Sequence, residues 1–333
     1  MDKLRANLIR PVLVPLPELF VERLRSIVPP ERFDGVLGSF SAPQAVGFRI
    51  NRLKGSEDAA LDELRSVGLS PEAVSPVPGA FAVPAEQRPQ LLNSEPASRD
   101  AIYIQNVSSQ LPPLILDPQP GERVLDLCAA PGSKTRQLAC LMQDEGEIVA
   151  VEKVRKRFYK LKANVARQGS TIVRPVLGSG TAYWHREPEA FDRVMVDAPC
   201  STEGRFRTDD PETTRYWSRR KIKEMQAKQR RLLFAGIQAL KPGGTLVYST
   251  CTFAPEENEA VLHKALRTFG DAVELVDARL DDLVGDAAQP GLLGWNDRVF
   301  NPHVSKARRV LPDGTFEAFF VACFTKHEST MRS

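Results

Sequence analysis

The chain has 333 residues, a formal net charge of +3, 42% hydrophobic residues and 26% charged residues. This composition is typical of a folded globular protein and excludes collagen-like, coiled-coil and wholly disordered chains. The length is about twice that of a typical domain, which predicts two domains.

The five cysteines include no CxxC pair, and only four widely spaced histidines are present. This pattern predicts free thiols in a reducing compartment, without disulfides and without a metal site. No apolar run approaches the roughly 20 residues of a membrane-spanning helix, and prolines interrupt the N-terminal segment. We therefore expect a cytoplasmic protein with no membrane partner.

Residues 1–100 have an irregular pattern that predicts a small α+β domain. Helical spacing covers 16–28, a strand is expected over 45–51, and Ser56 is a candidate N-cap for a helix that ends at Gly68. A second strand is expected over 80–83. The polar, proline-containing stretch 84–100 then predicts a linker.

From residue 101 onward, short apolar runs alternate with amphipathic stretches, which predicts βαβ units and a mostly parallel sheet with helices on both faces. The expected strands cover 123–127, 148–152, 172–177, 193–197, 245–249 and 316–324, and the expected helices cover 134–142, 156–168, 216–240 and 256–269.

Unusual residues follow the carboxyl ends of several predicted strands, where open α/β sheets bind ligands. A Gly-containing loop, 128–134, follows the first strand, and Glu152 ends the second. Two later strands end in Asp197-Ala-Pro-Cys200 and in Thr250-Cys251. Each feature alone is an ordinary turn, strand-end acid or buried thiol. Together at one edge they indicate a binding site.

Small residues in the 128–134 loop would let a ligand approach the backbone, and Lys134 could complement a carboxylate. Glu152 is suitably spaced to accept hydrogen bonds from a ribose diol, which fits an adenosyl ligand. Neither Cys200 nor Cys251 has a histidine nearby in the sequence, so a thiol hydrolase is a poor fit.

Two segments are rich in basic residues. Residues 153–167 contain seven Lys and Arg residues and no acidic residue, and residues 205–231 contain further basic residues among a few acidic ones. Either segment alone is compatible with a solvated helix face, but two of them in one chain favour a polyanion partner. Tyr216 and Trp217 could stack on a base or pack in the core.

Three segments together resemble the motifs of the RsmB/Nop/Sun family of S-adenosylmethionine-dependent RNA cytosine-5 methyltransferases. They are Val124-Leu-Asp-Leu-Cys-Ala-Ala-Pro-Gly-Ser-Lys-Thr135, Asp197-Ala-Pro-Cys-Ser201, and Val247-Tyr-Ser-Thr-Cys-Thr252 with Pro255-Glu-Glu-Asn-Glu259. Phe48-Arg-Ile-Asn51 and Tyr103-Ile-Gln-Asn106 also resemble family segments. The resemblance implies a Rossmann-like class I methyltransferase domain over 101–328, a tail over 329–333, and an RNA-binding role for the small domain at 1–100.

The resemblance also implies the roles of the site residues. Cys251 would be the nucleophile that adds to carbon 6 of cytosine, Cys200 would assist proton removal and product release, and Asp197 would bind the base and touch the cofactor. The implied S-adenosylmethionine contacts are Cys128, Ala129, Ala130, Pro131, Gly132, Ser133, Lys134, Glu152, Asp197 and Ser179. Ser179 stands where many relatives have an aspartate near the adenine.

A target cytosine must be unpaired or flipped out of a helix to reach Cys251. Arg205, Arg207, Arg219, Arg220 and Lys221 follow the Pro-Cys segment and could hold RNA phosphates. We expect a monomer that acts on ribosomal RNA, with transfer RNA as the second candidate substrate. The competing hypotheses are a non-catalytic RNA-binding assembly factor and a methyltransferase with a different acceptor.

Overall fold

The computed structural model describes residues 14–331. The first 13 positions of the predicted N-terminal domain and the last two of the predicted tail lie outside the described residues. No helix within the described range is long and apolar enough to cross a membrane.

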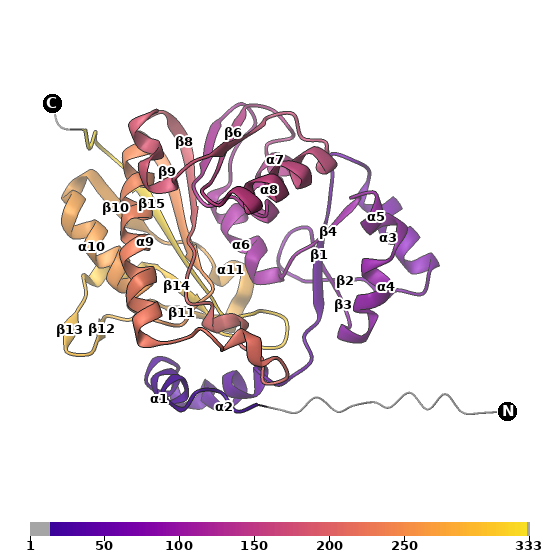
Figure 1. Ribbon diagram of the computed structural model, residues 1–333, viewed down its shortest axis with the longest axis horizontal. Helices are drawn as coiled ribbons and strands as arrows, with labels where there is room; N and C mark the ends of the chain where they lie inside the picture. Colours follow the sequence, from indigo (N-terminus) through magenta and orange to yellow (C-terminus); the bar gives the residue numbers. More distant parts are fainter. Residues whose placement is uncertain (1–13, 332–333) are drawn as a thin grey trace.

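A large sheet forms the centre of the protein (Figure 1). Its parallel strands are β5 (Arg123–Asp126), β6 (Glu147–Glu152), β7 (Val173–Leu177), β8 (Phe191–Asp197) and β9 (Leu240–Thr250). They lie in the order β7–β6–β5–β8–β9, and β15 (Phe319–Lys326) pairs antiparallel with β9. The order reverses between β5 and β8, which is where such sheets bind ligands. The predicted Rossmann-like sheet is confirmed.

Helices cover both faces of this sheet, as predicted. Leu232 of α9 (Arg219–Ala239) and Leu262 of α10 (Glu259–Phe269) pack on one face. The other face is covered by α6 (Val107–Leu116), α7 (Ser133–Leu141) and α8 (Arg155–Gln168). Because both faces are covered, the central strands are apolar almost throughout. For example, Ile148 to Val151 of β6 are all 0% exposed.

A smaller antiparallel sheet has the strand order β2–β3–β1–β4. Its strands are β1 (Val46–Ile50), β2 (Glu72–Ala73), β3 (Ala80–Val83) and β4 (Ile102–Ile104). Phe48 and Phe81 stack in its core, with α3 (Glu57–Ser66) packed against them. Ser56 caps α3 as predicted, because its hydroxyl accepts a hydrogen bond from the Ala59 amide.

The prediction of a linker over 84–100 is wrong. This stretch contains α4 (Arg88–Leu92) and α5 (Glu95–Ser98), and Leu91 is fully buried in the core of the small sheet. Each helix is only one turn or so long and has a proline in its first turn, where proline is tolerated. Such short, proline-containing turns lack the periodicity that identifies a helix in a sequence.

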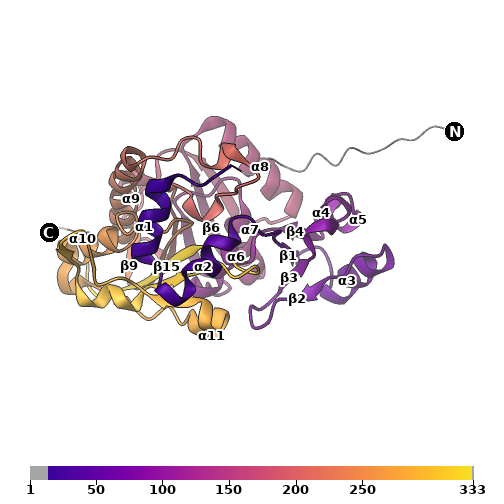
Figure 2. The same ribbon diagram turned by 90° about the horizontal axis from the view of Figure 1, so that it is seen from below.

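The first two helices, α1 (Glu18–Ile27) and α2 (Pro30–Ser39), precede the small sheet in the chain but pack elsewhere. Phe20 and Phe33 share an apolar cluster with Phe206 and Phe253, which flank the loops beyond β8 and β9. Figure 2 shows both helices lying across the body that contains the large sheet, with the small sheet to one side. The domain division at residue 100 remains a prediction.

The C-terminal part of the chain adds strands that the sequence pattern did not reveal. β10 (Val273–Val276) and β14 (Arg308–Val310) pair with β15, and β11 (Ala288–Pro290) pairs with β14. β12 (Gly294–Trp295) and β13 (Arg298–Val299) form a separate hairpin beside α10 (Figure 1). These strands are two to four residues long, too short to show alternation.

Candidate active site

A cavity of about 810 Å³ opens at the carboxyl ends of β5, β6, β8 and β9. Its volume lies within the range of sites that hold drug-sized ligands. The structure brings nearly all of the predicted cofactor and catalytic residues to its wall: Cys128, Ala129, Ala130, Pro131, Ser133, Lys134, Glu152, Ser179, Asp197, Cys200 and Cys251.

Gly132 is the one predicted cofactor residue that does not line the cavity. It stands immediately before α7 with a φ of 109°, a conformation that glycine adopts without strain. A Cβ atom there would also lie 3.1 Å from the Leu161 side chain. Its role in this structure is therefore to turn the chain into α7.

The two predicted catalytic thiols are in direct contact. The Sγ atoms of Cys200 and Cys251 lie 3.4 Å apart, within hydrogen-bond distance for sulfur. The hydrogen bond from Cys200, aided by the positive charge of Arg205, lowers the pKa of Cys251 to about 7 even though burial opposes this. The same contact and burial raise the pKa of Cys200. Of the two, Cys251 therefore ionises more readily, and the thiolate is the form in which a cysteine is nucleophilic.

Asp197 is held at the end of β8 by two hydrogen bonds. Its carboxylate accepts from Lys134 Nζ at 2.8 Å and from the Ser249 hydroxyl at 2.8 Å. Lys134 also donates to the Ser109 hydroxyl at 2.7 Å. Lys134 therefore complements the carboxylate of Asp197, which belongs to this chain and not to a ligand. This contact joins the 128–134 loop to the loop that carries Cys200.

The other side of the cavity has the features that an adenosyl ligand requires. Glu152 is 5% exposed, and one of its oxygens accepts from the Val154 amide at 2.7 Å. The Ser179 hydroxyl contacts Thr181 Oγ1 at 2.8 Å and remains on the cavity wall. Burial raises the pKa of Cys128, so this third thiol is neutral and does not compete as a nucleophile.

The sequence analysis missed Asp126, whose side chain forms hydrogen bonds at both ends of the 128–134 loop. Its buried carboxylate accepts from the Cys128 amide at 3.2 Å and from Thr135 Oγ1 at 2.7 Å, and burial raises its pKa to about 6. The signal was available, because Asp126 lies inside the Val-Leu-Asp-Leu segment. Ser109 also lines the cavity; with Gln110 it resembles a family segment, as the Tyr103-Ile-Gln-Asn106 segment does. Lys228 and Arg231 of α9 line the cavity too, and no motif indicated them.

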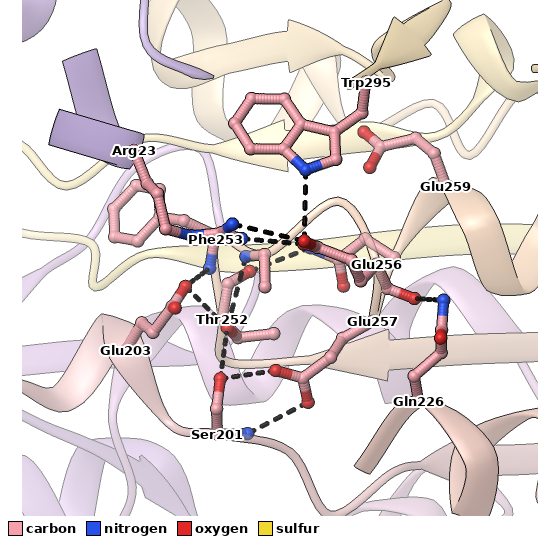
Figure 3. A network of polar contacts seen from close by, with 12 residues as sticks. Arg23, Ser201, Glu203, Gln226, Thr252, Phe253, Glu256, Glu257, Glu259 and Trp295 are labelled. Carbon is pink, nitrogen blue, oxygen red and sulfur yellow. Dashed lines mark hydrogen bonds and ion pairs between the residues drawn. The ribbon is translucent and has the colours of Figure 1, made fainter. Parts of the chain in front are cut away.

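A buried polar network begins at the residues that directly follow the two thiols in the chain, and Figure 3 shows its members. Ser201 and Thr252, which directly follow Cys200 and Cys251 in the chain, have their hydroxyl oxygens 2.9 Å apart. Ser201 also contacts Glu257 through its hydroxyl and donates its amide N–H to that carboxyl group at 3.0 Å. Thr252 donates to Glu203 at 2.8 Å. The network thus fixes the distance between the two cysteine loops.

The network needs one proton more than its two hydroxyl groups supply. Three side-chain contacts join Glu257, Ser201, Thr252 and Glu203 in a row, but the two hydroxyls supply only two hydrogens. The third hydrogen must come from a carboxyl group. Burial raises the pKa of Glu257 to about 8 and also raises that of Glu203, so Glu257 carries the proton near neutral pH.

The same network extends to the N-terminal helices. Arg23 of α1 donates to both oxygens of Glu256, at 3.2 and 2.7 Å, and Trp295 Nε1 donates to that carboxylate at 3.1 Å (Figure 3). Gln226 of α9 donates to the Glu256 carbonyl at 2.8 Å. Helix α1 is therefore bonded to the loop that immediately follows Cys251.

The residues predicted to bind RNA lie in three different environments. Arg205 is exposed at the cavity, where the charge of Cys251 raises its pKa. Arg207 donates to Asp209 and to the Ala42 carbonyl, which secures the segment after α2. Arg219 and Arg220 are exposed at the start of α9, whereas Lys221 pairs with Glu224 at 3.1 Å.

The two aromatics of this segment also differ. Trp217 packs against Phe20 and Phe206 and donates to Glu203 at 2.8 Å, so it belongs to the core. Tyr216 is 73% exposed and lies ahead of α9 rather than within it, since that helix begins at Arg219 and not at residue 216 as predicted.

Known proteins share both the sequence and the fold. Residues 113–325 match the family described as 16S rRNA methyltransferase RsmB/F. The ribosomal RNA small subunit methyltransferase F of Vibrio vulnificus is 39% identical over 265 residues, which cover 78% of this chain and 55% of that protein. The chain thus spans about half the length of such relatives.

Two archaeal proteins are similar over a larger share of their own length. The tRNA (cytosine(49)-C(5))-methyltransferase of Pyrococcus abyssi is 41% identical over 226 residues, 68% of this chain and 70% of that protein. A solved structure of a methyltransferase homolog from Pyrococcus horikoshii has a TM-score of 0.79 at 33% identity, covering 93% of this chain and 95% of that one. The chain therefore belongs to the RsmB/F methyltransferase family, as the motifs around Cys200 and Cys251 predicted.

Proposed function

We propose that this protein transfers a methyl group from S-adenosylmethionine to carbon 5 of a cytosine in RNA. The observation that carries the proposal is the contact between Cys200 and Cys251, 3.4 Å apart on the wall of a cavity that also contains Asp197 and Glu152. Family membership supports the same reaction.

The cofactor site fits S-adenosylmethionine in its residue types. Ala129 and Ala130 leave the backbone accessible, Glu152 would accept hydrogen bonds from the ribose, and Ser179 would lie beside the adenine. When bound, S-adenosylmethionine supplies an electrophilic methyl group and leaves as S-adenosylhomocysteine.

The protein residues would make the base reactive. The Cys251 thiolate bonds to carbon 6 of the ring, which turns carbon 5 into an enamine carbon that can take up a methyl group. Asp197 is held rigidly by Lys134 and Ser249, so it can bind the base near ring nitrogen 3 without reorganising. After methylation the carbon-5 proton leaves, and the bond between Cys251 and carbon 6 breaks.

Cys200 is the proposed acceptor of the carbon-5 proton. In the free protein its pKa is raised first by its hydrogen bond to Cys251 and also by burial and the charge of that thiolate. Once Cys251 is bonded to carbon 6, its sulfur carries no charge. Two of the influences that keep Cys200 protonated are then removed, so Cys200 can lose its proton to water in the open cavity. The resulting thiolate can accept the carbon-5 proton, which leaves Cys200 as a neutral thiol again.

We propose small-subunit ribosomal RNA as the substrate, because the family description and the Vibrio relative both name it. Transfer RNA is the second candidate, favoured by the Pyrococcus abyssi relative, of which this chain covers a larger share. Bisulfite sequencing of total RNA from cells with and without the protein tests both. Loss of a protected cytosine in ribosomal RNA supports the proposal, whereas a loss confined to transfer RNA supports the second candidate.

A non-catalytic assembly factor would give a different outcome. Cells that carry only the Cys251→Ala variant would then keep every protected cytosine found in wild-type cells. Under our proposal they lose the same cytosine as cells without the protein.

We also propose that the protein acts as a cytoplasmic monomer. Its five cysteines are free, as expected in a reducing compartment. A measured mass of one chain in solution, by light scattering, supports the monomer.

A further inference from the structure

Helix α8 has an exposed face that carries only positive charge. Residues 153–167 contain seven Lys and Arg residues and no Asp or Glu. Five of them, which we call the α8 basic face, are exposed and lie on or immediately before the helix: Lys153, Arg155, Lys156, Lys160 and Lys162. This surface has no part in the catalytic steps proposed above.

The fold does not neutralise this face. The two remaining cations of the run are paired, Arg157 with Glu152 at 3.5 Å and Arg167 with Asp100 at 2.8 Å. Between residues 14 and 331, no carboxylate lies within 4.0 Å of the charged nitrogens of the α8 basic face. The charges are therefore available to a partner.

The arrangement is unfavourable for the isolated helix. Arg155 and Lys156 lie in the first turn of α8, which contains no acid, although the amino end of a helix favours negative charge. Lys156 and Lys160 are four residues apart and therefore neighbours of like charge on one side of the helix. Features that break local rules without compensation inside the fold are expected at functional surfaces.

The position of α8 connects this face with the catalytic cavity. At its amino end, Lys153, Val154 and Arg157 line the cavity wall. At its carboxyl end, the Gln168 carbonyl accepts a hydrogen bond from Asn51, immediately after strand β1, at 3.2 Å. Figure 1 shows α8 on the side of the large sheet that faces the small sheet. Helix α8 therefore runs from the cavity to the small sheet, and the α8 basic face begins at the cavity and covers the first part of the helix.

An exposed aromatic ring lies among these charges. Tyr159 is 56% exposed, and on a helix it neighbours Arg155 and Lys162, four residues before and three residues after it. Cations that bind phosphates, interleaved with an aromatic that stacks on bases, are the combination that single-stranded nucleic acids require.

We propose that the α8 basic face binds the phosphate backbone of single-stranded RNA that leads to the cavity, and that Tyr159 stacks on one of its bases. This inference rests on the proposed function, because it assumes that the substrate is RNA. It adds a second RNA-binding surface, separate from Arg219 and Arg220 on α9.

Equilibrium binding of a fluorescein-labelled single-stranded RNA oligonucleotide tests the proposal. The variant is Lys156→Gln with Lys160→Gln. Its affinity for the RNA is expected to be roughly 10- to 30-fold weaker than that of the wild type at about 0.1 M salt. The slope of log affinity against log salt concentration should also be smaller by about 1.4, the value expected when two phosphate contacts to a single-stranded RNA are lost. Tyr159→Ala should weaken binding several-fold without changing this slope.

A matched control is Lys264→Gln with Arg267→Gln, which removes two exposed charges from α10, at the other side of the large sheet from α8 (Figure 1). Its affinity should stay within roughly twofold of that of the wild type. The α8 variant should unfold at the same temperature as the wild type or a higher one, since its like-charge repulsion is relieved.

Two results would overturn the proposal: unchanged affinity in the α8 variant, or an equal loss in the α10 control. Either can occur while the wild-type protein still methylates RNA, so failure of this inference is distinguishable from failure of the proposed function. If the α8 variant binds RNA as the wild type does but no longer binds vesicles of anionic lipid that the wild type binds, the face belongs to a membrane contact instead.

Discussion

Ser201 and Thr252 have their hydroxyl oxygens 2.9 Å apart, and they directly follow Cys200 and Cys251 in the chain. The contact between Cys200 and Cys251 is therefore set by a second contact one residue further along each loop. Because Glu257 bonds to Ser201 and Glu203 bonds to Thr252, the spacing of the thiols depends on buried groups that do not line the cavity.

Replacement of Cys251 by alanine should abolish methyl transfer, because no other group at this position can bond to carbon 6. Binding of S-adenosylmethionine, measured by calorimetry, should stay nearly unchanged, since the cofactor residues remain. Cys323→Ala is the matched control: this thiol is buried in β15, away from the cavity, and its removal should leave turnover intact. Full turnover by Cys251→Ala would refute its role as the nucleophile.

Replacement of Cys200 by alanine should trap a covalent complex between protein and RNA, because the step that releases the product loses its base. The complex is visible as a slowly migrating band in a denaturing gel after incubation with RNA and cofactor. The band should be missing in the double variant that also lacks Cys251. If Cys200→Ala gives no such band, the release role is wrong.

The pH dependence of adduct formation should reveal the contact between the thiols. In the wild type the single-turnover rate should rise with pH through about 7 and then level off, since the Cys251 thiolate is the reactive form. In Cys200→Ala the midpoint should move up, towards the ordinary cysteine value of about 8.5, because the stabilising hydrogen bond is gone. An unchanged midpoint would show that Cys200 does not tune its neighbour.

Glu257 should respond differently to two substitutions. Glu257→Gln mimics the protonated carboxyl group and should keep the fold, whereas Glu257→Ala leaves Ser201 and Gln229 without their partner and should cost about 2–4 kcal/mol of unfolding free energy. Denaturant titrations measure both. Equal stability of the two variants would show that the hydrogen bonds of this residue are unimportant.

The pKa of Glu257 also predicts how stability changes with pH. The folded-state pKa of about 8 lies above the ordinary glutamate value of 4.5, so the folded protein binds this proton more tightly than the unfolded chain. The associated stability is complete below about pH 4.5 and is lost as the pH rises towards 8. Glu257→Gln should flatten this part of the stability profile, and a profile identical to that of the wild type would contradict the assignment.

Arg219 and Arg220 provide a test of RNA binding at α9. Their joint replacement by glutamine should weaken RNA binding and make its salt dependence less steep, by about 0.7 for each phosphate contact that is lost. Lys241→Gln is a useful control, because that lysine is already paired with Asp192 at 2.7 Å. An unchanged salt slope would mean that the two arginines are only a solvated helix face.

The sequence predicted the catalytic half of the fold well because its strands are buried on both faces. The run Ile148 to Glu152 is apolar up to its last residue, and that last residue reaches the cavity. Cys200, Cys251 and Asp197 were expected at the same edge for the same reason, since each follows or ends such a strand, and all three line the cavity. The carboxyl ends of parallel strands meet at one edge whatever the loops do.

Contacts between distant segments could not be predicted from local patterns. Glu203 and Glu257 looked like ordinary charged residues, yet both are almost fully buried, because hydroxyls and amides from other loops satisfy them. The packing of α1 against the loop after Cys251 depends on Arg23 and Glu256, which are 233 residues apart in the chain. No periodicity carries information over such a separation.

The placement of α1 and α2 has a consequence for how the small sheet is attached. Because these helices pack beneath the cysteine loops, the chain leaves the large body after residue 40, builds the small sheet, and returns at α6. The small sheet is thus connected to the large body through both the segment that precedes it and the segment that follows it. A change in the orientation of the small sheet relative to the cavity would therefore have to be accommodated at both chain crossings, after α2 and at α6.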